Sequence, residues 1–215
     1  MAFGSFVANR NPNAGRDAPS GTKRTFVPIT MSSTLDVEPT PTTRWAWECT
    51  FPSPFAYAVS RAERTESLPA GLAHAVMRQE SGFDPSVVSP ARAIGAMQLL
   101  PETASAVATE MNRAHDRAWL VRPSHNITLG AHYLASLITR FHGRIPLAVA
   151  SYNCGPETVE KWTGRSAGLD VDMFVETIPY AETRGYVVRV MSNYARYAYL
   201  AKGDAGVPNI DLALR

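Results

Sequence analysis

Glu80 is the residue best placed to do chemistry in this sequence, because it ends an apolar stretch just before Gly82. Leu72, Ala75 and Val76 share one face of that stretch, which predicts a helix that ends at the glycine. Such a helix partly removes the Glu80 carboxyl from water and places it near the negative end of the helix dipole, and both effects raise its pKa. A carboxyl of this kind can act as a general acid near neutral pH, although a lone glutamate at a helix end is more often a solvated side chain.

The segment after Glu80 predicts an irregular loop that turns back across the helix end, because proline, serine and glycine recur over residues 85–95. Hydroxyl and amide groups in such a loop are suited to binding sugar hydroxyls and acetamido groups. Met97 and Leu100 follow, and each could form an apolar groove wall or belong to the core. Asp84 is a second carboxyl close in sequence, but its place before Pro85 favours a turn-capping role.

Four motifs follow one another in order over roughly residues 51–200. The residues that carry them are Glu80-Ser81, Ser89-Pro90, Gly95-Ala96-Met97-Gln98, Pro101 and Thr103-Ala104; then Asn126-Ile127, Leu129-Gly130 and Tyr133-Leu134; then Ala148 and Ser151-Tyr152-Asn153-Cys154-Gly155-Pro156; and finally residues 174–180 with 182–187. In this order they resemble the soluble lytic transglycosylases of glycoside hydrolase family 23, and the fourth resembles the subgroup with large periplasmic members. Agreement of one Glu-Ser pair would mean nothing, whereas chance agreement of all four motifs is not credible.

The resemblance implies a mostly α, lysozyme-like fold of the goose-type lysozyme/lytic transglycosylase kind. It implies that Glu80 is the single acid/base of a peptidoglycan lytic transglycosylase. Such an enzyme cleaves the β-1,4 bond between N-acetylmuramic acid and N-acetylglucosamine and forms 1,6-anhydromuramoyl ends. The substrate-binding residues that it implies are Ser89, Met97, Gln98, Leu100, Tyr152, Asn153, Glu176 and Tyr180. Of these, Tyr152 and Asn153 would come from a loop facing Glu80, and Glu176 would contact the peptide stem.

Two other functions stay open from the sequence. A hydrolytic muramidase on the same fold would use water in place of the sugar's C6 hydroxyl and would require a second carboxylate or a held water. A non-catalytic peptidoglycan-binding protein is the alternative of another class, and the intact Glu80 argues against it. One strongly placed carboxyl agrees better with the non-hydrolytic reaction, in which the C6 hydroxyl attacks C1.

Two residues depart from the family pattern. Arg92 stands where the family usually has glycine, so we expect a differently shaped turn or an added cation directed towards the groove. Cys154 stands where alanine is usual and introduces an oxidisable thiol. Cys49 is the other cysteine, and two free or buried thiols are favoured over a single bridge, which would require an exported protein.

The elements that must position these residues are predicted to be helices. The first is expected to run to Gly82, with Ser67 as its cap and Leu68-Pro69 in its first turn. Three more are expected: one from Pro101 towards Asn112, one with apolar residues at helical spacing over residues 127–141, and one from Pro146 to near Asn153. The last and longest stops at Lys202-Gly203 and carries these residues on one stripe: Tyr186, Val187, Val190, Tyr194 and Tyr197. No alternating stretch competes as a strand.

Composition and charge narrow the class of protein. The 215 residues are 45% hydrophobic and 19% charged, which is typical of a globular domain. The net charge of +2 is too small to indicate a nucleic-acid partner. No apolar run reaches about 18 residues, so no transmembrane segment is predicted. The histidines show no ligand spacing, so we expect no metal. The resemblance implies no cofactor and a monomer that acts on peptidoglycan glycan strands.

The two ends of the chain differ from its middle. We expect a flexible N-terminal tail or linker over residues 1–44, the transglycosylase catalytic domain over 45–203 and a C-terminal tail over 204–215. The first residues lack the basic start and long apolar stretch of a secretory signal. The expected location is nevertheless the periplasm or the cell wall. We expect either that another system delivers the protein, that the start of the sequence is truncated, or that this chain is part of a larger one.

Overall fold

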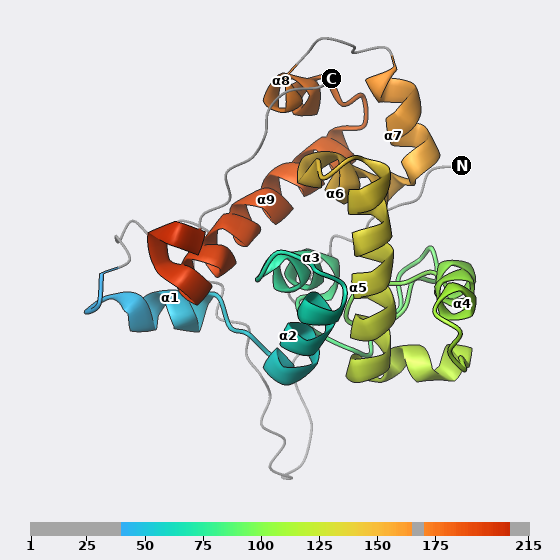
Figure 1. The fold of residues 1–215 in the computed structure, drawn as a ribbon, viewed down its shortest axis with the longest axis horizontal. Helices are drawn as coiled ribbons and strands as arrows, with labels where there is room; N and C mark the ends of the chain where they lie inside the picture. The colour runs from blue at the N-terminus through green and yellow to red at the C-terminus, as the bar shows by residue number, and fades with distance from the viewer. Residues whose placement is uncertain (1–39, 165–169, 207–215) are drawn as a thin grey trace, which may run out of the picture. The chain divides into compact units, whose positions relative to one another are not determined.

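A computed structural model describes residues 40–164 and 170–206, where the regular structure is helical (Figure 1). Contacts divide these residues into two compact units, with the boundary between Pro52 and Ser53. Helix α1 (Arg44–Thr50) belongs to the first unit. The expected N-terminal tail lies outside the described residues up to position 39, and the expected C-terminal tail lies outside them from position 207.

The second unit contains the elements that carry the motifs. They are α2 (Ala56–Thr65), α3 (Leu72–Ser81), α4 (Pro101–Glu110), η1 (Arg117–Val121), α5 (Pro123–Arg140), α6 (Ile145–Cys154), α7 (Pro156–Thr163), α8 (Val171–Thr177), α9 (Ala181–Lys202) and η2 (Gly203–Gly206), where η marks a 3-10 helix. Within the described ranges no strand forms, and isolated bridges join Val88 to Ile94 and Ile94 to Leu99. None of the described helices is long and apolar enough to cross a membrane.

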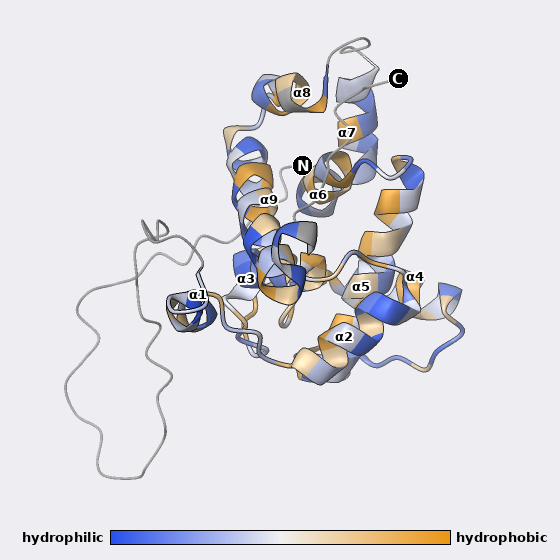
Figure 2. Cartoon of the chain, turned by 60° about the vertical axis from the view of Figure 1, so that its left-hand side comes forward, coloured by the Kyte–Doolittle hydropathy of each residue, from blue (hydrophilic) through white to orange (hydrophobic). Residues whose placement is uncertain are grey.

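Helix α3 is the buried centre of this unit. Every residue from Leu72 to Met77 is buried, and α9 packs along α3 with Tyr186, Val190 and Tyr194 facing inward. Helix α5 packs against both α2 and α6, and the helices carry hydrophobic and hydrophilic residues on different faces (Figure 2). Each large side chain buried in this way stabilises the fold by about 1.5–3 kcal/mol.

The start of α3 lies later than the sequence predicts. Ser67 does not cap a helix: it adopts a φ of 54°, and the helix begins at Leu72. The first backbone N–H groups are instead satisfied from α2, where Glu63 Oε1 accepts hydrogen bonds from Gly71 (2.9 Å) and Ala73 (3.1 Å). The predicted serine cap is therefore wrong, because a carboxylate from a neighbouring helix replaces it.

The other predicted helix ends agree with the structure. Helix α3 stops at Gly82, whose φ is 59°, α4 begins at Pro101, and α9 ends at Lys202. Helices α1, α2, α7 and α8 are further elements that the sequence did not predict. Helices α1, α7 and α8 have only 7 or 8 residues and so present few turns of apolar periodicity, whereas α2 is as long as the predicted α3.

Arg92 closes a turn in the loop after α3. The Arg92 N–H donates to Ser89 O (2.8 Å), and the Ser89 N–H donates to Ala93 O (2.9 Å). Arg92 has a φ of 65°, in the left-handed region that glycine enters without steric cost. The turn thus has the conformation that a glycine favours, although an arginine occupies it.

Replacing Arg92 by glycine is expected to raise the free energy of unfolding by about 0.5–1 kcal/mol, because the left-handed backbone is strained for a residue with a Cβ. Urea unfolding measures the change. Ala91→Gly is the matched control: Ala91 is not among the residues with positive φ, so that variant should lose stability. An Arg92→Gly protein that is no more stable than the wild type contradicts the strain argument.

Candidate active site

Glu80 lies in the last turn of α3 and is partly buried. Its Oε1 accepts a hydrogen bond of 2.5 Å from the hydroxyl of Tyr186, on α9. Burial raises the pKa of Glu80 to about 7, and the hydrogen bond from Tyr186 opposes that rise with a smaller effect. Near neutral pH this carboxyl is present in both its protonated and its ionised form, so it can donate a proton and take one back.

Tyr186 is a residue of the candidate site that the sequence did not single out. Its side chain is 0% exposed, and the sequence placed it only on the buried stripe of the last helix. Burial and the neighbouring Glu80 raise the pKa of Tyr186 well above its usual value, so its hydroxyl stays protonated and acts as the donor. Its position within the fourth motif, directly after Gly185, was the available signal.

Tyr152 lies beside this pair, in the last turn of α6. Its hydroxyl donates a hydrogen bond to the Met97 carbonyl oxygen (2.9 Å), and burial and the charge of Glu80 raise its pKa well above the usual value. Asn153 is the next residue, and its Oδ1 accepts from the Thr183 hydroxyl (2.7 Å), which ties α6 to α9. The expectation that both residues belong to a loop is wrong, because helix α6 extends through Cys154.

The loop between α3 and α4 is held by side chains that bond to its backbone. Ser81 Oγ donates to Ala96 O (2.7 Å), and Gln98 Nε2 donates to Gly95 O (2.9 Å). Asn126, on α5, accepts a hydrogen bond from the Met97 N–H (2.7 Å) and donates one to the Ile94 carbonyl oxygen (2.9 Å). These bonds fix the position of the loop relative to the end of α3, where Glu80 lies.

Of the two positions considered for Met97, a groove wall and the core, the structure places its side chain in the core. Its side chain is 0% exposed and packs against Gly130 of α5, where an added Cβ would lie 2.6 Å from Met97 Sδ. Gln98 is also buried, and its amide serves the loop backbone. Near the candidate acid, Met97 therefore contributes its carbonyl, through Tyr152, and no exposed side-chain surface.

The remaining predicted binding residues lie in several places. Ser89 is buried, and its Oγ accepts from the Ala93 N–H (3.0 Å) inside the turn. Leu100 is partly exposed at the start of α4, and Glu176 is exposed on α8. Tyr180 precedes α9 and is 52% exposed, with its ring edge-on to that of Trp162 at 5.0 Å between centroids. Within the described residues, no hydrogen bond or ion pair joins these four to Glu80.

The next two carboxylates after Glu80 in the sequence do not pair with it. Asp84 Oδ1 accepts from both the N–H (2.8 Å) and the hydroxyl (2.6 Å) of Ser86, which is the predicted turn-capping role. Glu102 is exposed in the first turn of α4. No cluster of three or more His, Cys, Asp or Glu that could hold a metal occurs in the part of the chain that the structure describes.

The two cysteines are free, Cys49 exposed and Cys154 buried at the end of α6. Each is a free thiol within its own unit, and whether they pair stays a prediction. Burial raises the pKa of Cys154 to about 11, so its thiol is almost wholly protonated at neutral pH. A buried, protonated thiol is a poor nucleophile, and Cys154 is therefore protected from the oxidation that its presence suggested.

In the folded protein we expect Cys49 alone to react rapidly with a chromogenic disulfide reagent, and Cys154 to react only after unfolding. The count of thiols modified before and after adding guanidinium measures this. A Cys154→Ala variant should keep both its fold and its cleavage activity, since alanine fills nearly the same space. Equal reaction rates for the two thiols in the native state would show that Cys154 is accessible.

Comparison with known proteins identifies the family. The model of the transglycosylase SLT domain matches residues 57–174, more than half of the chain, and the soluble lytic transglycosylase helical domain matches residues 177–205. The soluble lytic murein transglycosylase of Salmonella typhimurium is 38% identical over 152 residues, which cover 69% of this chain and 24% of the relative. That of Escherichia coli K12 is 37% identical over the same length and shares. The chain thus spans about a quarter of these relatives.

Solved structures show the same fold. The 70-kDa soluble lytic transglycosylase of Escherichia coli has a TM-score of 0.73 and 34% identity, over 78% of this chain and 28% of that one. The complex of the 70-kDa enzyme with bulgecin A has a TM-score of 0.72 and 33% identity, over the same shares. An inactive glutamate-to-glutamine mutant of Slt from Pseudomonas aeruginosa has a TM-score of 0.72 and 32% identity, over 75% and 26%. The predicted mostly α, lysozyme-like fold is confirmed.

Proposed function

Because this chain belongs to the transglycosylase SLT domain family, we propose that it cleaves peptidoglycan glycan strands as a lytic transglycosylase, with Glu80 as its single acid/base. The observation that carries the proposal is a partly buried carboxyl with a pKa of about 7, held by the hydroxyl of Tyr186. The bond cleaved is the β-1,4 bond between N-acetylmuramic acid and N-acetylglucosamine. The product carries a 1,6-anhydromuramoyl end.

In the first step, protonated Glu80 donates its proton to the glycosidic oxygen. The bond from that oxygen to C1 of N-acetylmuramic acid breaks, and an oxocarbenium-like or oxazolinium species forms, aided by the substrate's acetamido group. The Tyr186 hydroxyl already donates to Glu80 Oε1, so it stabilises the carboxylate that this step creates. The carboxylate in turn stabilises the positive charge on the sugar.

In the second step, the Glu80 carboxylate takes the proton from the C6 hydroxyl of the same sugar. The oxygen of that hydroxyl attacks C1 and closes the 1,6-anhydro ring, and Glu80 returns to its protonated form. One carboxyl therefore serves as acid and then as base, and its pKa of about 7 suits both roles at neutral pH. Water is not consumed.

The hydrolytic alternative needs a second carboxylate or a held water near Glu80, because glycosidases that consume water use two carboxylates about 5–9.5 Å apart. Asp84 is engaged by Ser86 in its own turn, and Glu102 is exposed on α4. The intramolecular attack needs only the one carboxyl whose pKa is about 7, and for that reason we favour it over hydrolysis.

The proposed substrate contacts come from several elements of the fold. Tyr152 and Asn153 end α6, Ser89, Gln98 and Leu100 belong to the loop before α4, and Glu176 and Tyr180 belong to the segment between α8 and α9. The exposed Glu176 and Tyr180 are suited to contact the peptide stem and a sugar ring. We further propose that residues 45–203 form the catalytic domain, acting as a monomer in the periplasm or at the cell wall. The compact unit from Ser53 onward contains most of this range, whereas residues 45–52 belong to the other unit.

Digestion of purified sacculi, with mass spectrometry of the released muropeptides, tests this function. We expect muropeptides that end in 1,6-anhydro-N-acetylmuramic acid. Reducing ends would favour the muramidase alternative. Co-sedimentation with sacculi without any release would favour the non-catalytic binding protein.

A further inference from the structure

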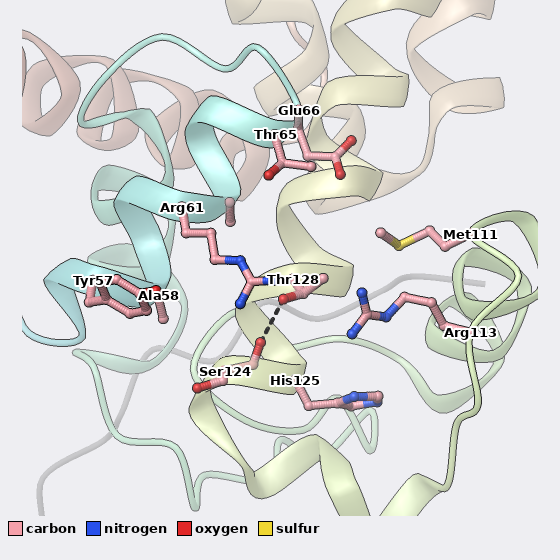
Figure 3. Close-up of a pocket in the computed structure, with 11 residues that line it drawn as sticks. Tyr57, Ala58, Arg61, Thr65, Glu66, Met111, Arg113, Ser124, His125 and Thr128 are labelled. Carbon is pink, nitrogen blue, oxygen red and sulfur yellow. Dashed lines mark hydrogen bonds between the residues drawn. The ribbon is translucent and has the colours of Figure 1, made fainter.

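A pocket of about 330 Å³ lies between α2, the first turns of α5 and the segment after α4 (Figure 3). Neither Glu80 nor the residues bonded to it line this pocket, so the proposed reaction leaves it without a role. Its lining mixes apolar and polar residues, and the polar ones include Arg61 from α2, Arg113 from the segment after α4, and Ser124 and His125 from α5. Small-molecule sites begin at about this volume.

Two guanidinium groups face each other across the pocket. The side chains of Arg61 and Arg113 come from different elements and point toward one another above Ser124 and Thr128 (Figure 3). In the described parts of the chain, neither arginine forms an ion pair with a carboxylate. Two like charges converging on one cavity repel each other, and an anion placed between them would turn that repulsion into attraction.

Glu66 is the carboxylate among the lining residues, and its Oε2 lies 2.8 Å from Nδ1 of His132 rather than in an ion pair with an arginine. The lining thus sets two guanidinium groups against one carboxylate, which leaves an excess of positive charge. His125 Nε2 is paired with His115 Nδ1 at 2.9 Å. Burial lowers the pKa of His125, and the charge of Arg113 lowers it further, as expected where the local potential is positive.

We propose that this pocket is an oxyanion-binding site, in which a carboxylate or phosphate group lies between Arg61 and Arg113. Guanidinium groups present paired N–H donors that match the two oxygens of such a group. The Thr128 hydroxyl already donates to the Ser124 carbonyl (2.8 Å), so the donors for the anion are the two guanidinium groups. The pocket volume exceeds that of a single ion, so the oxyanion is carried by a larger organic ligand.

The same chemistry has two sources. If the proposed function holds, the carboxylates of the peptidoglycan peptide stem are one source, and the pocket would then bind the polymer at a second point besides the cleavage site. A phosphate-bearing ligand is the other source. The existence of the oxyanion site follows from the pocket itself and does not depend on the cleavage chemistry.

Calorimetric titration of the full chain with inorganic phosphate and with the dipeptide L-Ala-γ-D-Glu tests the proposal. Neutral N-acetylglucosamine serves as the negative probe. We expect at least one of the anions to bind, with an affinity that falls as sodium chloride is added. Trp119 gives a second readout, because its ring lies edge-on to that of His125, with 5.5 Å between centroids. Tighter binding of the dipeptide assigns the site to the peptide stem, and tighter binding of phosphate assigns it to a phosphate-bearing ligand.

The double variant Arg61→Gln/Arg113→Gln should bind the same anion at least about tenfold more weakly. Arg64→Gln is the matched control, since Arg64 is an exposed arginine on the same helix that does not line the pocket. Circular dichroism and thermal unfolding verify that both variants fold. Absence of binding by the wild type, equal binding by the double variant, or an equal loss in Arg64→Gln would overturn the proposal.

Cleavage of sacculi by the wild-type chain is scored separately. Anion binding without cleavage would contradict the proposed function and leave the oxyanion site standing. Cleavage without anion binding would contradict the oxyanion site and leave the proposed function standing.

Discussion

Replacing Glu80 by glutamine is expected to lower the rate of peptidoglycan cleavage by about 100- to 10,000-fold, because the amide cannot act as a general acid. The side chain keeps its shape, and its oxygen can still accept the hydrogen bond that Tyr186 now donates to Glu80. The fold should therefore be unchanged. The initial rate of clearing of a sacculus suspension, at equal enzyme concentration, measures the loss.

The same substitution should raise the stability of the protein at alkaline pH. The pKa of Glu80 is about 7 in the folded state against an ordinary value of 4.5 for a glutamate in water, so the folded state binds this proton more tightly than the unfolded state does. Stability therefore falls as pH rises through the window from 4.5 to about 7, and the ionised carboxylate costs about 1–3 kcal/mol above it. Urea unfolding at about pH 8 should show Glu80→Gln to be the more stable protein, with the difference vanishing near pH 4.

Glu63→Gln is the matched control for both the loss of cleavage and the gain in stability at alkaline pH. Burial raises the pKa of Glu63 to about 7 as well, but its carboxylate accepts hydrogen bonds from the backbone at the start of α3, far along that helix from Glu80. This variant should share the gain in stability at alkaline pH and retain cleavage. If Glu63→Gln folds and loses as much activity as Glu80→Gln, the assignment of the proton donor to Glu80 is contradicted.

Tyr186→Phe is expected to shift the pH dependence of cleavage as well as slow it. The hydroxyl of Tyr186 donates to the Glu80 carboxylate and so lowers the pKa of Glu80; without it, that pKa rises above about 7. Because the reaction begins with protonated Glu80, activity falls as pH rises through this pKa. The alkaline limb of the profile should therefore move to higher pH, while the maximal rate drops about 10- to 100-fold as the carboxylate intermediate loses its donor.

Tyr152→Phe separates this effect from a general disturbance of the site. Its hydroxyl donates to the Met97 carbonyl and not to Glu80, so its removal should lower activity without moving the alkaline limb. The measurement is the rate of muropeptide release between about pH 5 and pH 9, a range that brackets the pKa values expected for an acid/base of this kind. An unshifted limb in Tyr186→Phe, or the same shift in both variants, would show that Tyr186 does not set the pKa of Glu80.

The sequence predicted the helices from local residue patterns, and it predicted the fold and the candidate acid from a resemblance carried by four short motifs. Helical periodicity, the stop residue Gly82 and the start residue Pro101 located the larger helices, and four ordered motifs located Glu80. What remained hidden depends on contacts between residues far apart in the chain. Tyr186 lies 106 positions from Glu80, and no period in α9 distinguishes a core tyrosine from one that holds a carboxyl.

Two further residues show the same limit in physical terms. Ser67 has the residue type of a helix cap, yet the cap of α3 comes from Glu63 on another helix, and only tertiary packing brings that carboxylate there. Met97 suits a groove wall and a core equally well, since both are apolar. The absence of a side chain at Gly130 of α5 makes the space that buries Met97, and that pairing becomes visible only in the folded chain.

The most direct test of the central claim, a single Glu80 that acts first as acid and then as base, is cleavage of sacculi in water enriched in oxygen-18. Intramolecular attack by the C6 hydroxyl takes no oxygen from solvent, so the released muropeptides should carry unlabelled anhydro ends. Mass spectrometry of these ends distinguishes the two fates of C1. Incorporation of one solvent oxygen into reducing ends, at a rate that matches strand cleavage, would contradict the account.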